Sequence, residues 1–125
     1  MKKSTVGIIV GIVVVVVLPM GYYFYDMFTP GKLDSFAGCL KEKGVLFYGA
    51  FWCPHCQEQK ALFGRSADKL PYTECSAPNG KDQLAVCEDA GIKSYPTWIL
   101  QNGEILNGSQ TLETLSEKTG CELPL

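Results

Sequence analysis

The chain has 125 residues, of which 46% are hydrophobic, and it contains six cysteines. This size suits one small domain with a membrane segment, and an even cysteine count in a short chain is typical of an oxidising compartment. Lys2 and Lys3 leave nine basic against thirteen acidic residues in the rest of the chain, so no basic surface for a nucleic acid is expected.

Residues 1–25 have the pattern of a membrane segment. Two lysines precede an apolar run over 6–18, and three tyrosines, which favour a membrane–water interface, follow it. Residues 5–24 are about enough to cross a ~30 Å hydrocarbon core as a helix. Positive charge before the apolar run and acidic residues after it predict a cytoplasmic N-terminus and an extracytoplasmic domain. A cleaved signal peptide is the alternative, but no A-x-A-like site follows the run, which favours an uncleaved signal anchor.

Residues 26–32 form a linker to a domain over 33–125. Apolar spacing and turn residues predict, in chain order, a helix that starts near 33 and ends before Gly44, a strand at 45–50, a helix at 54–63, a strand at 71–75, a helix at 81–90, a hairpin with arms at 97–101 and 104–106, and a helix at 111–119. The right-handed crossover rule makes the first two strands parallel. This order predicts an α/β fold with a mixed sheet and helices on both faces.

The segment Phe51-Trp52-Cys53-Pro54-His55-Cys56 joins the first strand to the next helix. Two thiols at this spacing can face each other across the first helical turn and close a reversible disulfide. Pro54 is tolerated as the first helical residue because its missing N–H would be unbonded there. The helix dipole and a protonated His55 both favour a thiolate, so we expect a lowered pKa and the role of nucleophile for Cys53. Cys56 would then resolve the mixed disulfide.

A zinc half-site and a purely structural disulfide can use the same cysteine spacing. Zinc needs four ligands, but no second C-x-x-C follows and His55 is the only histidine, so no metal is expected. Redox poise does not follow from spacing alone, so a structural disulfide stays open as an alternative. His55 could also be a solvated surface side chain without a redox role.

The segment 52–56, with Ser94-Tyr95-Pro96-Thr97 downstream, resembles thioredoxin-fold disulfide oxidoreductases. Its Cys-Pro-His-Cys order resembles the DsbA-type disulfide oxidases. The longer strings 48–56, 59–60, 62–64, 72–75 and 91–98 are similar to the thioredoxin-like domain fused to bacterial vitamin K epoxide reductase homologues. This similarity covers about residues 44–119, and the membrane-embedded reductase of those fusions is absent from this chain.

The resemblance implies a thioredoxin fold lacking its first strand, and a redox-active disulfide, Cys53–Cys56, that needs no further cofactor. It also implies that Pro96 is cis and lies against the active site. A cis turn there would expose the backbone of Tyr95 to an extended substrate segment, which makes Trp52 and Tyr95 expected substrate contacts. Ordinary core packing is the competing interpretation of both side chains.

The resembling domains carry a second cysteine pair, which implies a structural disulfide between Cys75 and Cys87. Cys39 and Cys121 remain and would pair by elimination. A disulfide requires Cα atoms within ~7 Å, and the sequence does not give that distance, so this pairing stays open.

One position departs from the thioredoxin pattern. Thioredoxin-type enzymes usually bury a carboxylate six positions before the first cysteine, where this chain has Phe47. Glu58 would lie on the helix, with unknown access to Cys56. The proton acceptor for Cys56 is therefore unassigned, which favours an oxidase over a thioredoxin-like reductant.

These features predict a membrane-anchored, extracytoplasmic thiol–disulfide oxidoreductase of the cell membrane. It would oxidise cysteines of exported proteins and pass electrons to a separate quinone-linked membrane thiol oxidase of the vitamin K epoxide reductase type. A reductase or isomerase, for example in cytochrome maturation, is the alternative, and the reduction potential separates the two. A metal chaperone or peptide-binding module is a third hypothesis, although copper chaperones on this fold use a wider cysteine spacing and a distant histidine.

Overall fold

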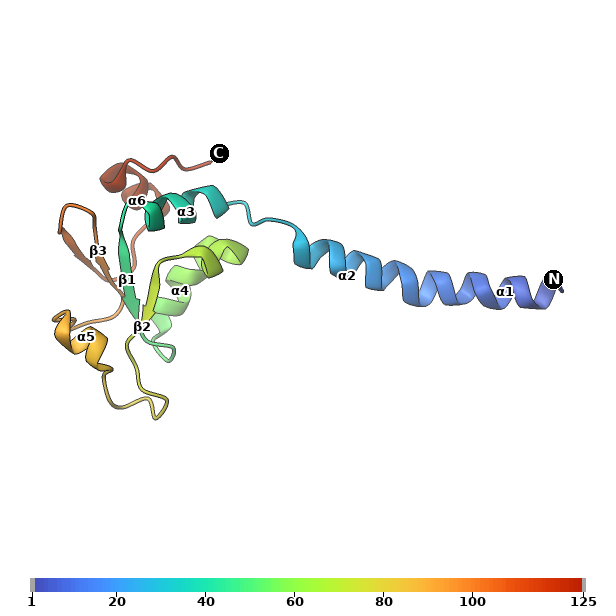
Figure 1. The fold of residues 1–125 in the computed structure, drawn as a ribbon, viewed down its shortest axis with the longest axis horizontal. Helices are drawn as coiled ribbons and strands as arrows, with labels where there is room; N and C mark the ends of the chain where they lie inside the picture. Colours follow the sequence, from blue (N-terminus) through green and yellow to red (C-terminus); the bar gives the residue numbers. More distant parts are fainter. Residues whose placement is uncertain (1, 125) are drawn as a thin grey trace. The chain divides into compact units, whose positions relative to one another are not determined.

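The computed structural model describes residues 2–124 and divides into two units, Met1–Pro30 and Gly31–Leu125. The first unit contains one helix, Lys3–Phe28, that is long and apolar enough to cross a membrane. It consists of α1 (Lys3–Ile12), a π-helical turn (Val13–Val17) and α2 (Leu18–Phe28). Figure 1 shows α1 and α2 as one continuous helix. The helix continues past residue 25, where we placed the end of the anchor.

The π-helical turn explains how this helix accommodates a proline. Pro19 lacks an N–H, and in a regular α-helix its ring clashes with the carbonyl four residues earlier. The turn at Val13–Val17 directly precedes it, and the Leu18 N–H bonds to the Val13 carbonyl, five residues back. This wider bonding pattern lets the helix pass Pro19 without a break.

The second unit contains a four-stranded mixed sheet in the order β2-β1-β3-β4. Its strands are β1 (Leu46–Gly49), β2 (Tyr72–Glu74), β3 (Thr97–Ile99) and β4 (Ile105–Asn107). As predicted, β1 and β2 are parallel and β3 and β4 form an antiparallel hairpin. The structure adds that β3 is antiparallel to β1. The helices are α3 (Asp34–Glu42), α4 (Pro54–Phe63), a 3-10 helix (Gly64–Lys69), α5 (Ala85–Asp89) and α6 (Leu112–Thr119). This is a thioredoxin-like α/β fold.

Side chains alternate along β1 and fill two clusters on opposite faces of the sheet. Phe47 belongs to the larger cluster, which includes residues of α3, α4 and α6, and stacks on Trp98 with ring centroids 4.3 Å apart. Tyr48 belongs to the smaller cluster, with Cys75 and Cys87. Helices therefore cover both faces, and Figure 1 shows α4 and α5 on either side of β2.

The predicted helix over 81–90 is wrong at its start, because α5 begins only at Ala85. Gln83 instead forms an antiparallel bridge with Ser76, and the Leu84 N–H donates to the Cys75 carbonyl at 2.7 Å. Backbone pairing with the loop after β2 thus replaces the first helical turn.

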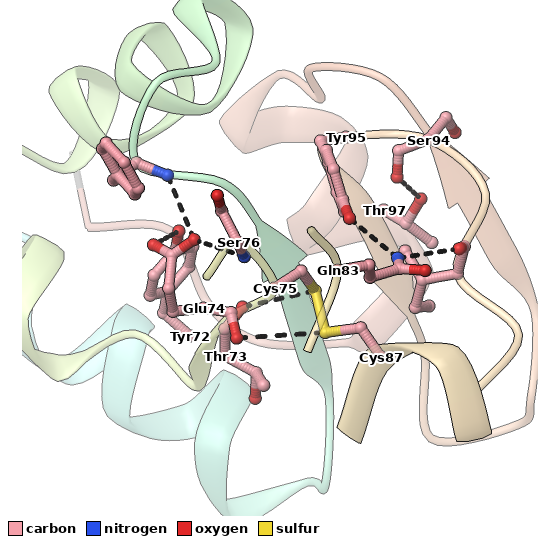
Figure 2. Close-up of a disulfide and its surroundings, with 12 residues drawn as sticks. Tyr72, Thr73, Glu74, Cys75, Ser76, Gln83, Cys87, Ser94, Tyr95 and Thr97 are labelled. Atoms are coloured by element: carbon pink, nitrogen blue, oxygen red, sulfur yellow. Dashed lines mark hydrogen bonds between the residues drawn. A yellow bond between two sulfur atoms is a disulfide. The ribbon is translucent and has the colours of Figure 1, made fainter. Parts of the chain in front are cut away.

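Two disulfides tie the second unit together. Cys75 and Cys87 are bonded with Cα atoms 5.5 Å apart, and Cys39 and Cys121 are bonded with Cα atoms 5.8 Å apart. Both distances meet the geometric requirement. The first joins the end of β2 to α5, as Figure 2 shows, and the second joins α3 to the segment that follows α6.

The two disulfides should differ in their contribution to stability because they close loops of different length. Sequence separations of 12 and 82 residues correspond to about 3 and about 4.5 kcal/mol in the chain-entropy scheme. We expect the Cys39→Ala/Cys121→Ala variant to unfold at a lower denaturant concentration than Cys75→Ala/Cys87→Ala. Urea unfolding of the full chain in detergent measures both, and the opposite order would contradict this expectation.

Candidate active site

The free thiols, Cys53 and Cys56, lie where β1 gives way to α4. Cys53 is the N-cap residue of α4 and Pro54 is its first residue, the position that tolerates a missing N–H. Cys53 is 6% exposed and Cys56 is 1% exposed. Cys53 is therefore the more accessible of the two thiols.

Cys56 packs directly against the end of β1 at Gly49. A methyl group at Gly49 would lie 2.8 Å from Cys56 Sγ and 2.8 Å from Cε2 of Tyr72, closer than any side chain can approach. Burial raises the pKa of Cys56 to about 12, and Cys53 adds to this increase, whereas a backbone hydrogen bond at Ala50 and the charge of Lys60 oppose it. Cys56 is therefore a neutral thiol at pH 7.

The loop before β3 lies against Cys53. The Tyr95–Pro96 peptide bond is cis, and Cys53 Sγ donates to the Tyr95 carbonyl at 3.7 Å. Trp52 meets the Tyr95 ring edge-on, with centroids 6.0 Å apart. The structure thus brings the four predicted residues Trp52, Cys53, Tyr95 and Pro96 together.

Trp52 and Tyr95 differ in how they are held. Trp52 is 48% exposed, so it is not a core residue, and its Nε1 donates to Ser76 Oγ at 2.9 Å. Tyr95 is half-buried, and its hydroxyl accepts from Gln83 Nε2 at 2.7 Å, which Figure 2 shows. A hydrogen bond to a residue of the segment after β2 therefore holds each ring, while Trp52 stays half exposed.

The side chain of His55 lies at the surface, next to Glu58. Its Nδ1 lies 3.2 Å from Glu58 Oε2, and both side chains are 69% exposed. Within residues 2–124, no hydrogen bond joins His55 to Cys53 or Cys56. Any effect of the imidazole on the thiols therefore acts through space, and Glu58 faces His55 and solvent.

Tyr72, Glu74 and Lys60 form a polar group to which the sequence analysis assigned no role. Glu74 Oε2 accepts from the Tyr72 hydroxyl at 2.8 Å, and Oε1 accepts from the backbone N–H groups of Phe51 at 3.1 Å and Ser76 at 2.9 Å. Lys60 Nζ lies 3.4 Å above the Tyr72 ring centroid. The sequence did contain one indication of this group: side chains alternate along a strand, so residues 72 and 74 lie on the same face of β2.

Gln59 was also missed, although it fixes the active-site helix in place. It is fully buried and exchanges hydrogen bonds with the backbone of Gln110, at 3.0 Å and 2.6 Å. Its Oε1 also accepts from Nε1 of Trp98 at 3.3 Å.

Within residues 2–124, no group of three or more His, Cys, Asp or Glu side chains is arranged to hold a metal ion.

Fold and site together define a thioredoxin-like domain with a buried dithiol at a helix start. No family model matches the chain. It is 47% identical over 88 residues to the thiol-disulfide oxidoreductase LTO1 of Arabidopsis thaliana, covering 67% of this chain and 23% of that protein. It is 34% identical over 76 residues to protein disulfide-isomerase A5 of Bos taurus, covering 52% of this chain and 14% of that protein. The chain is therefore a relative of thiol–disulfide oxidoreductases.

The chain spans about a quarter or less of the length of these curated relatives. Among solved structures, it resembles oxidised glutaredoxin 2 from Chlamydomonas reinhardtii with a TM-score of 0.42 and 24% identity, covering 74% of this chain and 100% of that one. The fold assignment rests on the strand order and directions described above.

The raised pKa of Cys56 predicts a pH-dependent stability of the reduced protein. An unfolded Cys56 loses its proton near its ordinary pKa of 9.0, whereas the folded one keeps it up to about 12. Between these two pH values the folded state binds more protons than the unfolded state. The free energy of unfolding is therefore unaffected by Cys56 below pH 9 and falls above it, by at most about 1.4 kcal/mol per pH unit. Urea unfolding of the reduced full chain between pH 8 and 10.5 measures this loss. The Cys56→Ser variant should show a smaller loss, and an equal loss would contradict the assignment.

Proposed function

We propose that this chain is a membrane-anchored thiol–disulfide oxidoreductase with Cys53–Cys56 as its redox centre. The observation that carries the proposal is the division of the six cysteines: four form disulfides, and the remaining two lie at the start of α4. The names of both curated relatives, an oxidoreductase and a disulfide isomerase, support it. The redox-active disulfide serves as the electron carrier, without a further cofactor.

We propose that the enzyme works as an oxidase of exported proteins. A substrate thiolate attacks Cys53 Sγ of the Cys53–Cys56 disulfide and expels the Cys56 thiolate, which takes up a proton. A second substrate thiolate then attacks the substrate sulfur of the mixed disulfide and expels Cys53. The substrate gains a disulfide and loses two electrons, which the enzyme holds as two thiols. A separate quinone-linked membrane thiol oxidase of the vitamin K epoxide reductase type would re-oxidise them.

The surface around Cys53 suits an extended polypeptide. Phe51 and Trp52 are each about half exposed beside the thiol. The loop that contains Tyr95 and Pro96 also lies next to Cys53, and its backbone can pair with a substrate strand. We therefore assign substrate binding to Trp52, Tyr95 and Pro96, and add Phe51.

The proposed location is the outer side of the cell membrane. Two lysines precede the apolar helix, a charge order that favours a cytoplasmic N-terminus. Disulfides persist in oxidising compartments, and the domain contains two of them in addition to the redox pair. An uncleaved anchor would keep the domain close to a membrane partner, whereas a cleaved signal peptide would release it.

The oxidising direction rests on the Cys-Pro-His-Cys sequence and on Phe47. This side chain is fully buried and stacked on Trp98, so the position that resembling reductants give to a carboxylate is apolar here. A reductase or isomerase uses the same thiols in the other direction. A reduction potential near that of DsbA, roughly −120 mV, supports the oxidase, and one near that of thioredoxin, roughly −270 mV, supports the reductase.

The proposed function predicts covalent trapping of substrates. In a Cys56→Ala variant, Cys53 can form a mixed disulfide that no neighbouring thiol resolves. We expect the full chain with this change, expressed in its own cell, to accumulate adducts with exported cysteine-containing proteins that dithiothreitol releases. A Cys53→Ala/Cys56→Ala variant is the matched control. Equal adducts in both variants would contradict Cys53 as the nucleophile.

His55 should raise the reduction potential when it is protonated, because a cationic imidazole stabilises a nearby thiolate more than a disulfide. We expect His55→Ala to lower the potential, so that the protein becomes a weaker oxidant. Equilibration with glutathione measures the change. Glu58→Gln, which removes the carboxylate beside the imidazole, is a control for the His55–Glu58 contact, and an unchanged potential in His55→Ala would remove His55 from the mechanism.

A further inference from the structure

Cys56 needs a partner for its proton. If the proposed function holds, Cys56 must gain a proton when it leaves the disulfide and lose one when it closes it again. The residue is 1% exposed, and its pKa of about 12 leaves almost no thiolate at pH 7. Phe47 occupies the position where resembling enzymes keep a carboxylate, so the acceptor has to come from elsewhere.

Tyr72 is the polar side chain that meets Cys56 at the end of β1. Both side chains occupy the space that a Gly49 side chain would fill: a methyl group there would lie 2.8 Å from Cys56 Sγ and 3.3 Å from the Tyr72 hydroxyl oxygen. The sulfur and the phenol oxygen are therefore at most about 6 Å apart, a span that a direct contact or one bridging water covers.

The Tyr72 hydroxyl connects this space to a carboxylate. It donates to Glu74 Oε2 at 2.8 Å, as Figure 2 shows. Glu74 Oε1 is held by the backbone N–H groups of Phe51 and Ser76, so the carboxylate has a fixed orientation. Burial raises the pKa of Tyr72, and the Glu74 carboxylate adds to this effect. Tyr72 thus stays a neutral phenol, which can pass a proton on without ionising.

Lys60 supplies the positive charge of this group. It follows Cys56 by one helical turn and lies 3.4 Å above the Tyr72 ring, where cation–π attraction holds it. Its charge lowers the pKa of Cys56. The titratable groups that act on the pKa of Cys56 are thus Cys53, the N-cap residue of α4, and Lys60 on α4. Tyr72 on β2 faces the same space at Gly49, with Glu74 behind it, whereas His55 and Glu58 pair at the surface.

We propose that Glu74 is the proton acceptor for Cys56 and that the Tyr72 hydroxyl carries the proton between them. During closure, Cys56 Sγ attacks Cys53 Sγ of the mixed disulfide while its proton moves to the Tyr72 oxygen and the Tyr72 proton moves to Glu74. The Cys53–Cys56 bond forms, and the bond from Cys53 to the substrate sulfur breaks, so that a substrate thiolate leaves. In the oxidising direction, the same path returns the proton to Cys56. Lys60 is a positioning residue that holds the Tyr72 ring.

A two-phase reaction separates the step of Cys56 from that of Cys53. When the reduced full chain in detergent reacts with excess 5,5′-dithiobis(2-nitrobenzoate), attack by Cys53 releases one thionitrobenzoate and closure by Cys56 releases a second. Stopped-flow absorbance resolves both phases. Tyr72→Phe keeps the ring and removes only the hydroxyl, and Glu74→Gln keeps an oxygen for the backbone N–H groups. Glu58→Gln is the matched control, a carboxylate exchange on the solvent side of α4.

At pH 7 we expect both site variants to slow the second phase at least about tenfold, a modest part of a general-base contribution, and to change the first phase less than about twofold. The deficit should shrink as pH rises, because hydroxide then removes the Cys56 proton, and the double variant should be no slower than the single ones. Glu58→Gln should match the unaltered chain.

An unchanged second phase in Tyr72→Phe or Glu74→Gln would overturn the proton path. Equal slowing of both phases, or slowing that does not depend on pH, would also overturn it, because it would indicate a structural role alone. The complete absence of a second phase in the unaltered chain would instead contradict the proposed function, since Cys53 and Cys56 would then not form a disulfide.

Discussion

The close contact between the first turn of α4 and the end of β1 determines most of the site. Gly49 has no side chain, and the sulfur of Cys56 and the ring of Tyr72 occupy the space that one would take. The contact buries Cys56, and this burial raises its pKa. Any larger residue at Gly49 would have to separate α4 from β2. Cys56 can therefore be buried against β1 because residue 49 is a glycine.

Two further constraints hold the surroundings of the thiols. The Cys75–Cys87 disulfide anchors the segment that contains Ser76, and Ser76 in turn holds the Trp52 indole. Gln59 attaches α4 to the backbone of Gln110. These contacts hold α4 and the residue before Cys53, while the thiol of Cys53 stays next to the exposed Phe51 and Trp52.

Local patterns were enough to predict the strand-to-helix junction and the parallel pairing of β1 and β2. Pro54 begins α4 because proline suits a first helical position, and that rule needs no tertiary information. Gln83 shows where local patterns fail: its stretch reads as helix, but backbone pairing with Ser76 takes precedence. Cys39 and Cys121 are 82 residues apart, so only the folded chain brings them within bonding distance.

The proton partner of Cys56 could not be found from sequence spacing. It depends on the parallel register that places Glu74 beside Gly49, and on the ring of Tyr72 reaching the same glycine. The alternation of Tyr72 and Glu74 along β2 was visible, but nothing in the sequence connects that face with Cys56. Side chains from β2 and α4 meet there over the glycine of β1, so the group exists only in the folded domain.

The central claim is that one pair of cysteines is reactive while two pairs are structural. Equilibrating the full chain in a glutathione series, alkylating the free thiols and counting them by mass spectrometry tests it directly. We expect two alkylated residues, Cys53 and Cys56, to appear together over one narrow range of potential. The four cysteines of the disulfides should stay unmodified there, because structural disulfides have lower potentials. Co-reduction of Cys75–Cys87 or Cys39–Cys121 with the active-site pair would contradict the claim.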